Sequence, residues 1–328
     1  MAVFYMRTAV LIPCFNEEVA IPHVVRDFRT ALPSARIYVY DNNSSDKTVA
    51  FAKQASAIVR SEPLQGKGNV IRRMFSDVDA DIYLLVDGDN TYEAAAAPRM
   101  IDALVERSLD MVVGRRVEAA ELAYRPGHRF GNNMLTGVVA MIFGSCTQDM
   151  LSGYRVFSRR FVKSFPTLSR GFEIETELTV HALELRMPTL DIDTQYVGRL
   201  PGSQSKLNTV RDGLRIVRMI GALVKEERPL QFFGLSSIVL ALGSLVLIYP
   251  VFIEYLRTGL VLRFPTAILS AAIMTVAILA FFAGLILDTV THGRREMKRL
   301  IYLGYNSVSV ALENSRGGDD ESGGRSTS

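Results

Sequence analysis

Two aspartates separated by one glycine, Asp87 and Asp89, directly follow an apolar run at residues 82–86. In a turn after a buried strand, one of two carboxylates at this spacing can bind a hard cation, and the turn fixes the direction of the other. A cation bound there would neutralise the charge that develops on a departing diphosphate. An Asp-x-Asp sequence is also common in solvated turns, so the position of this motif after a strand is what favours a metal site.

Polar residues also follow the first two apolar runs of the chain. Asp41 ends the second run and can accept hydrogen bonds from a base or a ribose, whereas Asp46 is more typical of a helix cap. Residues 13–18 follow the first run, and Glu17 and Glu18 also suit a first helical turn, where the helix dipole favours acidic side chains. These positions favour nucleotide contacts, with an ordinary turn and cap as the alternative.

Lys67 lies between two glycines, Gly66 and Gly68. The segment lacks the spacing of a phosphate-binding P-loop, because Ser61 stands where the first glycine of that motif would be. Lys67 can still approach a nucleotide, so it is a candidate nucleotide-binding residue.

Several basic residues adjoin strand ends or loops rich in glycine and serine. Arg116 follows a strand-like run, Arg129 lies in a second basic stretch, and Arg199 and Lys206 bracket a loop that contains Ser205. Most exposed charges are only solvated, but guanidinium groups in such loops can bind phosphate oxygens through paired hydrogen bonds. These residues therefore predict a second phosphate site, separate from the acidic motif.

Further carboxylates occur in residues 149–153 and 171–177. Their spacing alone does not indicate a role. Asp149 is the one candidate for a general base, should the reaction need one.

The elements that must position these residues alternate between short apolar runs and stretches with helical spacing. This alternation predicts a parallel sheet covered by helices on both faces. In such sheets ligands bind beyond the carboxyl ends of the strands, so the polar strand ends should converge on one crevice. The four runs are residues 8–13, 37–40, 82–86 and 111–113, and their polar ends are residues 13–18, 41–46, 87–92 and 114–116.

The apolar excess of the chain is concentrated in two segments, at about residues 232–252 and 264–287. Each approaches or exceeds the roughly 20 residues that a helix needs to cross a bilayer. Basic residues flank the outer ends of the pair, which predicts that both of its ends face the cytoplasm and that a short loop lies outside. The alternative is a pair of core helices in a soluble protein.

Residues 207–224 show helical spacing of apolar side chains opposite a basic face. This helix either lies in the membrane interface or packs on the preceding domain. The expected division of the chain is therefore a catalytic domain at residues 1–205, an amphipathic helix at 206–230, two membrane helices at 231–291, and a basic segment with a disordered tail at 292–328.

Composition excludes several other classes of protein. The formal net charge of +3 is too small to indicate nucleic-acid binding. Two cysteines, Cys14 and Cys146, cannot build a disulfide framework, and four scattered histidines offer no zinc-like cluster. The first residues lack the pattern of a cleavable signal peptide.

Taken together, these motifs resemble those of family 2 glycosyltransferases. They are most similar to the polyprenyl-phosphate branch, which includes dolichyl-phosphate mannose synthases and bacterial undecaprenyl-phosphate glycosyltransferases. The two apolar segments resemble the membrane anchor of many bacterial members. The resemblance covers roughly residues 8–230 and is carried by residues 10–18, 39–46, 66–68, 87–89, 114–116, 149–153, 171–177 and 198–207.

This resemblance implies a GT-A fold and inverting transfer of a sugar from a UDP- or GDP-linked donor to a polyprenyl phosphate at the cytoplasmic membrane face. It implies Mg²⁺ or Mn²⁺ as cofactor, with Asp89 and Asp87 as catalytic and metal-binding residues beside the diphosphate and the sugar. Nucleotide contacts would come from Pro13, Glu17 and Asp41, with Asn16 and Lys67 as further candidates. The acceptor phosphate would be held by Arg116, Arg129, Arg199, Ser205 and Lys206.

Two residues depart from the family pattern, because Asn42 replaces a second aspartate and Thr91 replaces a glutamine after the Asp-x-Asp motif. The glutamates of residues 171–177 also differ from the mannose-synthase pattern, so mannose is not indicated as the sugar. A hydroxyl acceptor, which would need Asp149 as base, and a non-catalytic nucleotide-sugar-binding module stay open. A processive polysaccharide synthase is disfavoured, because its Gln-x-x-Arg-Trp motif needs a tryptophan and the chain has none. A homo-oligomer is compatible with the sequence.

Overall fold

The computed structural model describes residues 6–118, 137, 139–140, 147–167, 173–198, 221–222 and 224–313 of the 328-residue chain. The chain divides into two compact units. The first unit combines Met1–Gly213 with Lys298–Ser328, and the second is Leu214–Met297.

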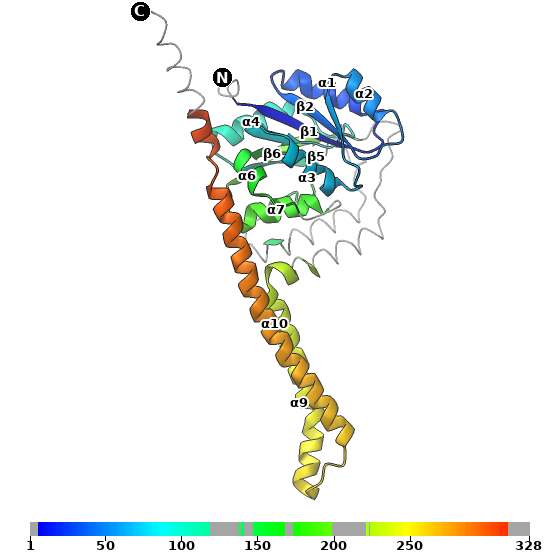
Figure 1. Ribbon diagram of the computed structural model, residues 1–328, viewed down its shortest axis with the longest axis vertical. Coiled ribbons are helices and arrows are strands. Elements are labelled where there is room, and N and C mark those ends of the chain that lie inside the picture. Colours follow the sequence, from blue (N-terminus) through cyan, green and yellow to red (C-terminus); the bar gives the residue numbers. More distant parts are fainter. Residues whose placement is uncertain are drawn as a thin grey trace, which may run out of the picture. The chain divides into compact units, whose positions relative to one another are not determined.

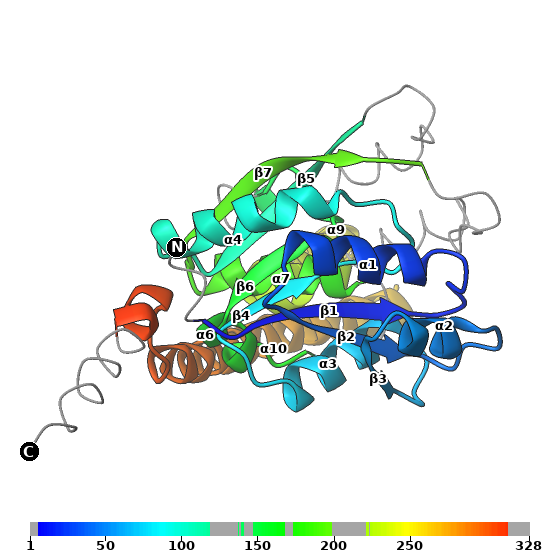
Figure 2. The same ribbon diagram turned by 90° about the horizontal axis from the view of Figure 1, so that it is seen from above.

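A seven-stranded sheet forms the centre of the first unit, with strand order β3-β2-β1-β4-β6-β5-β7 (Figure 2). All strand pairs are parallel except those made by β6, which is antiparallel to both of its neighbours. The mostly parallel sheet predicted from the sequence is therefore confirmed. The strands are β1 (Thr8–Cys14), β2 (Arg36–Asp41), β3 (Ile58–Ser61), β4 (Ile82–Leu85), β5 (Met111–Glu118), β6 (Arg155–Ser158) and β7 (Thr189–Tyr196).

Alternate side chains of the central strands enter two separate cores. In β1, Val10 and Ile12 belong to one core, and Ala9 and Leu11 belong to the other. All four are buried, which explains why this strand reads as a continuous apolar run rather than an alternating one.

Helices cover both faces of this sheet, and Figure 1 shows α1 and α2 on one side and α7 on the other. Apolar residues of α1, α2 and α4 belong to the first core, and those of α3, α6 and α7 belong to the second. The helices are α1 (Ile21–Ala31), α2 (Thr48–Gln54), α3 (Lys67–Asp77), η2 (Ala94–Ala96), α4 (Ala97–Glu106), α6 (Arg159–Ser164) and α7 (Ile174–Glu184).

Two element boundaries differ from the sequence prediction. Residues 114–116 were expected to follow a strand, but β5 continues to Glu118 because it pairs with β7 along its whole length. Glu17 and Glu18 were considered for a first helical turn, but α1 begins at Ile21. Pro22 lies in the first turn of α1, where a missing backbone N–H costs nothing.

The topology brings the polar strand ends to one edge of the sheet. Cys14 pairs with Asp41 at the ends of β1 and β2, and Leu11 pairs with Leu85, so residues 86–89 continue beside the end of β1. Because β6 runs in the opposite direction, the segment before it reaches the same edge. Asp149 lies in that segment, so its carboxylate joins the predicted crevice.

The second unit is a pair of long helices, α9 (Pro229–Thr258) and the part of α10 (Phe264–Leu303) that precedes Lys298. They lie side by side in Figure 1, and Gly259 ends α9 with a φ of 71°. The Ser237 hydroxyl donates to the Ala277 carbonyl oxygen across the pair at 2.7 Å, and Ser244 and Ser270 are also hydrogen-bonded.

Most large apolar side chains of this pair are exposed, including Leu235, Val246 and Leu279. Small polar residues between the helices and apolar residues outside them are typical of helices that pack together in lipid. Both helices are long and apolar enough to cross a membrane. The predicted spans at residues 232–252 and 264–287 lie within them, whereas nearly all of the predicted helix at residues 207–224 lies outside the described residues.

Residues 292–313, which were expected to form a basic segment after the second span, pack in part on the first unit. Helix α10 continues to Leu303, and its residues from Lys298 onward belong to the first unit. The ammonium of Lys298 lies 2.6 Å from the Glu184 carboxylate, and Val308 is buried in the first core. Residues 314–328 lie outside the described part.

Candidate active site

The acidic motif stands directly after β4. Asp89 is 6% exposed, and its Oδ1 accepts hydrogen bonds from the backbone N–H of Thr91 at 3.3 Å and from the Thr91 hydroxyl at 2.6 Å. Thr91, one of the two departures from the family pattern, therefore orients this carboxylate. A Cβ atom on Gly88 would lie 2.7 Å from Sγ of Cys14, so only glycine lets the motif pack against the end of β1.

The other aspartate of the motif is held by a buried lysine. Nζ of Lys67 lies 2.5 Å from Oδ1 of Asp87 and also forms a short ion pair with Glu175. Burial lowers the pKa of Lys67, but the two carboxylates outweigh it and the pKa is raised overall. Lys67 is therefore a fixed cation between two acids. A Cβ atom on Gly153 would lie 2.7 Å from Cγ of Asp87, so this glycine leaves the room that the carboxylate occupies.

The candidate nucleotide side is formed by the loops after β1 and β2. The Asp41 carboxylate is buried and accepts hydrogen bonds from the backbone N–H of Ser44 at 3.3 Å. Asn16 Oδ1 accepts from the backbone N–H of Ser45 at 2.8 Å, and the backbone N–H of Glu17 donates to the Thr48 hydroxyl at 2.8 Å. The structure thus places Asn16, Glu17 and Asp41 together, with Pro13 at the end of β1.

Asn42, the second departure from the family pattern, has a structural reason. Its side-chain amide donates to the carbonyl oxygens of Glu62 and Leu64, each at 2.8 Å, and its Oδ1 accepts from the backbone N–H of Gly66 at 2.7 Å. An ionised aspartate cannot donate, so it could not make the first two bonds. The amide ties the end of β2 to the loop that carries Lys67.

Two residues with separately predicted roles form one ion pair. Nε and one terminal nitrogen of Arg116 donate to the two oxygens of Asp149, both at 2.7 Å. The guanidinium also lies over the ring of Tyr196, 5.5 Å from its centroid. Asp149 is buried, and this guanidinium donates to both of its carboxylate oxygens.

Sequence reasoning missed Arg155, which is fully buried. Its guanidinium donates to the carbonyl oxygens of Met150 at 2.6 Å and Ser152 at 3.0 Å, and to the Thr179 hydroxyl at 2.8 Å. Burial lowers the pKa of Arg155, yet arginine stays charged in proteins. Arg155 thus fixes the segment that carries Asp149, and its position at the start of the short buried strand β6 was the one available signal.

The rest of the predicted phosphate site cannot be placed. Arg129, Arg199, Ser205 and Lys206, like Cys146, lie outside the described residues. Their roles as acceptor ligands remain predictions from the sequence.

The described residues fit a cation shared with a substrate. Among them, no three His, Cys, Asp or Glu side chains are grouped so that they could hold a metal alone. Mg²⁺ usually takes one or two protein carboxylates and completes its shell with substrate phosphates and water. Asp89, buried and oriented at the strand end, is a hard oxygen group that would suit such a cation, and Asp87 is two residues away.

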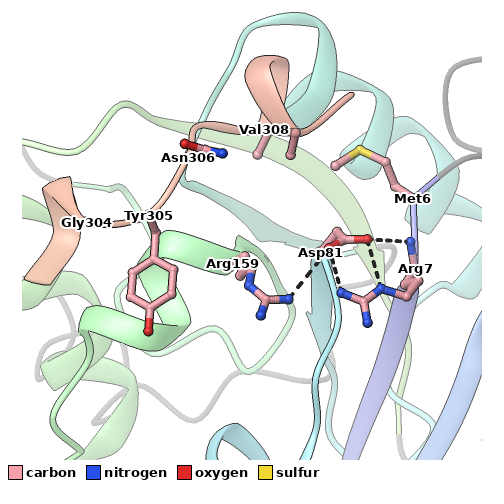
Figure 3. A pocket seen from close by; sticks show the side chains of 9 residues that line it. Met6, Arg7, Asp81, Arg159, Gly304, Tyr305, Asn306 and Val308 are labelled. Atoms are coloured by element: carbon pink, nitrogen blue, oxygen red, sulfur yellow. Dashed lines mark hydrogen bonds and ion pairs between the residues drawn. The ribbon is translucent and has the colours of Figure 1, made fainter. Parts of the chain in front are cut away.

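A pocket of about 340 Å³ lies at the opposite edge of the sheet, away from the acidic motif. Figure 3 shows Arg7 and Arg159 pointing toward Asp81 on its wall. Arg7 and Asp81 immediately precede β1 and β4, so this pocket adjoins the amino ends of the strands. The acidic motif and its partners, by contrast, lie at the carboxyl ends.

A family model and two similar proteins found by sequence are described as glycosyltransferases. The sequence model described as Glycosyl transferase family 2 matches residues 9–162. Over 231 residues the chain is 36% identical to Glycosyltransferase AglJ of Haloferax volcanii, covering 69% of this chain and 74% of that protein. It is 24% identical over 217 residues to Undecaprenyl-phosphate mannosyltransferase of Micrococcus luteus, covering 62% of this chain and 88% of that one.

The fold is also that of a solved enzyme. Glucosyl-3-phosphoglycerate synthase from Mycobacterium tuberculosis, crystallised with Mn²⁺, UDP and phosphoglyceric acid, aligns with a TM-score of 0.56 at 18% identity. The alignment covers 68% of this chain and 79% of that one. This likeness identifies the GT-A fold that was expected from the sequence.

Proposed function

Because the chain belongs to glycosyltransferase family 2, we propose that it transfers a sugar from a nucleotide-diphosphate-sugar to a polyprenyl phosphate. The observation that carries this proposal is the Arg116–Asp149 pair at the edge of the sheet that also holds Asp87 and Asp89. An arginine fixed at the same edge of the sheet as an acidic motif that would hold a cation suits two negatively charged substrates that must be brought together.

The acceptor would supply its own nucleophile. A phosphomonoester has a second pKa of about 6, so near pH 7 it is mostly a dianion. One of its oxygens would attack the anomeric carbon directly, with inversion, while the bond from that carbon to the diphosphate breaks and the nucleoside diphosphate leaves. No general base is needed, and catalysis rests on positioning and charge neutralisation.

The protein residues divide these tasks between them. Asp89 would hold Mg²⁺ or Mn²⁺, which supplies charge neutralisation for the departing diphosphate. Asn16, Glu17 and Asp41 would contact the nucleotide. Arg116, oriented by Asp149, would bind the acceptor phosphate. The sequence assigns Arg129, Arg199, Ser205 and Lys206 to the same phosphate.

The two apolar helices provide the link to a lipid acceptor. We place them across the cytoplasmic membrane as a two-helix anchor, with the GT-A unit in the cytoplasm, where nucleotide-sugars are made. The division into a catalytic domain, a juxtamembrane helix at residues 206–230 and an anchor at residues 231–291 belongs to this proposal. The exposed apolar surface of α9 and α10 supports it.

A hydroxyl acceptor is the competing function. Transfer to a hydroxyl needs a base near the anomeric carbon, and Asp149 is the candidate that the sequence offers. Its carboxylate is engaged on both oxygens by Arg116, which disfavours proton abstraction.

Purified full-length enzyme in detergent, supplied with undecaprenyl phosphate and a panel of UDP- and GDP-sugars, tests the proposal. We expect formation of a glycosylated lipid phosphate and release of nucleoside diphosphate with one or more donors, only when Mg²⁺ or Mn²⁺ is present. Undecaprenol without the phosphate is the matched control. Equal transfer to that alcohol, or transfer only to glycan hydroxyls, would contradict the proposal.

A further inference from the structure

We propose that Lys67 and Glu175 are positioning residues, which hold the carboxylate of Asp87 in place for the transfer reaction. In this arrangement Lys67 serves the acidic motif and is not a ligand of the nucleotide. The inference rests on the proposed function, because it assigns a task within that reaction.

The geometry brings three charged groups from separate elements to one point. Nζ of Lys67, at the start of α3, lies 2.5 Å from Asp87 after β4 and in a short ion pair with Glu175 on α7. The side chains of Lys67 and Glu175 are 9% and 7% exposed, while that of Asp87 is 28% exposed. Asp87 is therefore the member of the triad that can face a substrate.

The charges of the triad favour a fixed arrangement. One ammonium lies between two carboxyl groups, so the single lysine must serve both acids. Burial raises the pKa of Glu175, and the nearby lysine works against that rise. Removing one partner from a buried ion pair leaves an uncompensated charge, which is strongly unfavourable. Lys67 is thus held between its acids and has little freedom to move toward a diphosphate.

The backbone around the triad is itself fixed. Gly66, with a φ of 129°, precedes Lys67 and donates its N–H to Asn42. On the other side, the Thr179 hydroxyl donates to the carbonyl oxygen of Glu175 at 3.1 Å and accepts from Arg155. Arg155 also holds the segment that ends at Gly153, against which Asp87 packs. Asp87 therefore lies between the Lys67–Glu175 pair on one side and Gly153 on the other. Arg155 is hydrogen-bonded to the backbone or side chains next to both.

The contribution of a carboxylate beside the reacting sugar to the rate depends on where that carboxylate is held. A displacement of about 1 Å can cost about 10²-fold in rate without changing how substrates bind elsewhere. Loss of Lys67 should therefore lower kcat, whereas loss of a nucleotide ligand should weaken binding of the nucleotide.

The test compares Lys67→Met, Glu175→Gln and the double variant with Arg73→Met in the full-length protein. Arg73 is an exposed basic residue on the same helix, paired with Asp77, and serves as the matched control. Binding of UDP and GDP with Mn²⁺ is measured by calorimetry, alongside kcat, the donor KM and the melting temperature. We expect kcat of Lys67→Met to fall about 10²-fold while the nucleotide Kd changes less than about threefold.

The double variant shows whether the two residues act through one group. If both act through Asp87, its kcat should be no lower than that of Lys67→Met, because the losses of coupled residues do not add. The double variant also removes one acid together with the lysine. It keeps the test valid if the single substitution of Lys67 prevents folding.

Two results would overturn the inference. One is a loss of nucleotide affinity above about tenfold in Lys67→Met with kcat unchanged at saturating donor. The other is a double variant whose fold-loss in kcat equals the product of the fold-losses of Lys67→Met and Glu175→Gln. Failure of the proposed function is a separate result, namely no transfer to polyprenyl phosphate by the unaltered enzyme. The binding comparison still decides the role of Lys67 in that case, since it needs no lipid.

Discussion

Asp89 accepts two hydrogen bonds from Thr91 through one carboxylate oxygen, and this fixes the carboxylate at the end of β4. Asp89→Asn keeps the shape of the side chain but removes its negative charge. We expect a loss of about 10²–10³ in kcat, because an amide cannot replace a carboxylate on Mg²⁺ or Mn²⁺ and electrostatic contacts of this kind carry that much. Turnover measured against metal concentration, with melting temperature as the folding control, checks this. If the Asp89→Asn variant, assayed in chelated buffer, turns over substrate nearly as fast as the unaltered enzyme does with metal, the metal assignment is refuted.

His181 offers a test of stability against pH. Burial, and secondarily the charge of Lys298, lower its pKa to about 3 from an ordinary value of about 6.5. The unfolded chain therefore binds one more proton than the folded chain between these values. Stability is fully present above pH 6.5 and is lost as the pH falls toward 3, at up to about 1.4 kcal/mol per pH unit.

Replacing this histidine should remove that part of the acid sensitivity. His181→Gln keeps a polar side chain that can reach the Ser164 hydroxyl, with which Nε2 of His181 is hydrogen-bonded at 3.1 Å. Between pH 7.5 and 5 its melting temperature should fall less steeply than that of the unaltered protein. Parallel curves for the two proteins would show that His181 is not the group responsible.

Single residues also mark the limit of what the sequence could predict about the site. Asp87 and Asp89 follow a recognisable strand and Asp41 ends another, so the local pattern was enough to predict their place at one edge of the sheet. Glu175 and Arg155 act on residues that are distant in sequence, and the Lys67–Glu175 pair spans 108 positions. Such partners can be recognised only once the helices have been packed on the sheet.

At the scale of elements, strands were predicted well where both faces are buried and less well where pairing decides their length. The apolar part of β5 is only three residues long, yet the strand extends through two arginines to Glu118 because β7 pairs with it throughout. A similar cause explains residues 298–313. Their apolar and basic side chains carry no local sign of the surface they pack on, so only a basic segment was expected there.

The segment after Met297 is held to the first unit by a buried ion pair. Lys298 lies 2.6 Å from Glu184, whose side chain is 1% exposed. Lys298→Met should lower the free energy of unfolding of the GT-A unit by about 3 kcal/mol, because breaking a buried ion pair leaves a charge uncompensated. Arg299→Met is the matched control, since Arg299 is adjacent, basic and exposed. Thermal unfolding of the purified protein measures both. If the two variants lose equal free energies of unfolding, the Lys298–Glu184 ion pair does not contribute to stability beyond the loss of one basic residue.

At the scale of the whole molecule, length and hydropathy were sufficient to predict the two apolar helices. Their extent was not predictable in the same way, because α9 extends past its predicted span at both ends and α10, which begins at Phe264 as expected, continues to Leu303. A hydropathy pattern reports which part of a helix can lie in lipid, not where the helix ends. Orientation depends on the flanking basic residues.

The membrane topology of the two helices can therefore be tested directly. If α9 and α10 form a two-helix anchor, the turn between them should lie outside the cytoplasm, and the segment after α10 should lie within it. The reasons are spans of sufficient length, basic residues on the outer flanks of the pair, and a supply of nucleotide-sugars on the cytoplasmic side. Cysteine labelling in intact cells can measure this after Cys14 and Cys146 are replaced by alanine.

Two exposed positions, one on each expected side, serve as probes. Thr258→Cys lies at the end of α9 and should react with a membrane-impermeant maleimide in intact cells. Asn306→Cys follows α10 within the first unit and should react only after lysis. Labelling of both positions after lysis controls for accessibility. Labelling of Asn306→Cys from outside would place the GT-A unit on the wrong side of the membrane for a cytoplasmic donor, and the proposed reaction could not take place there.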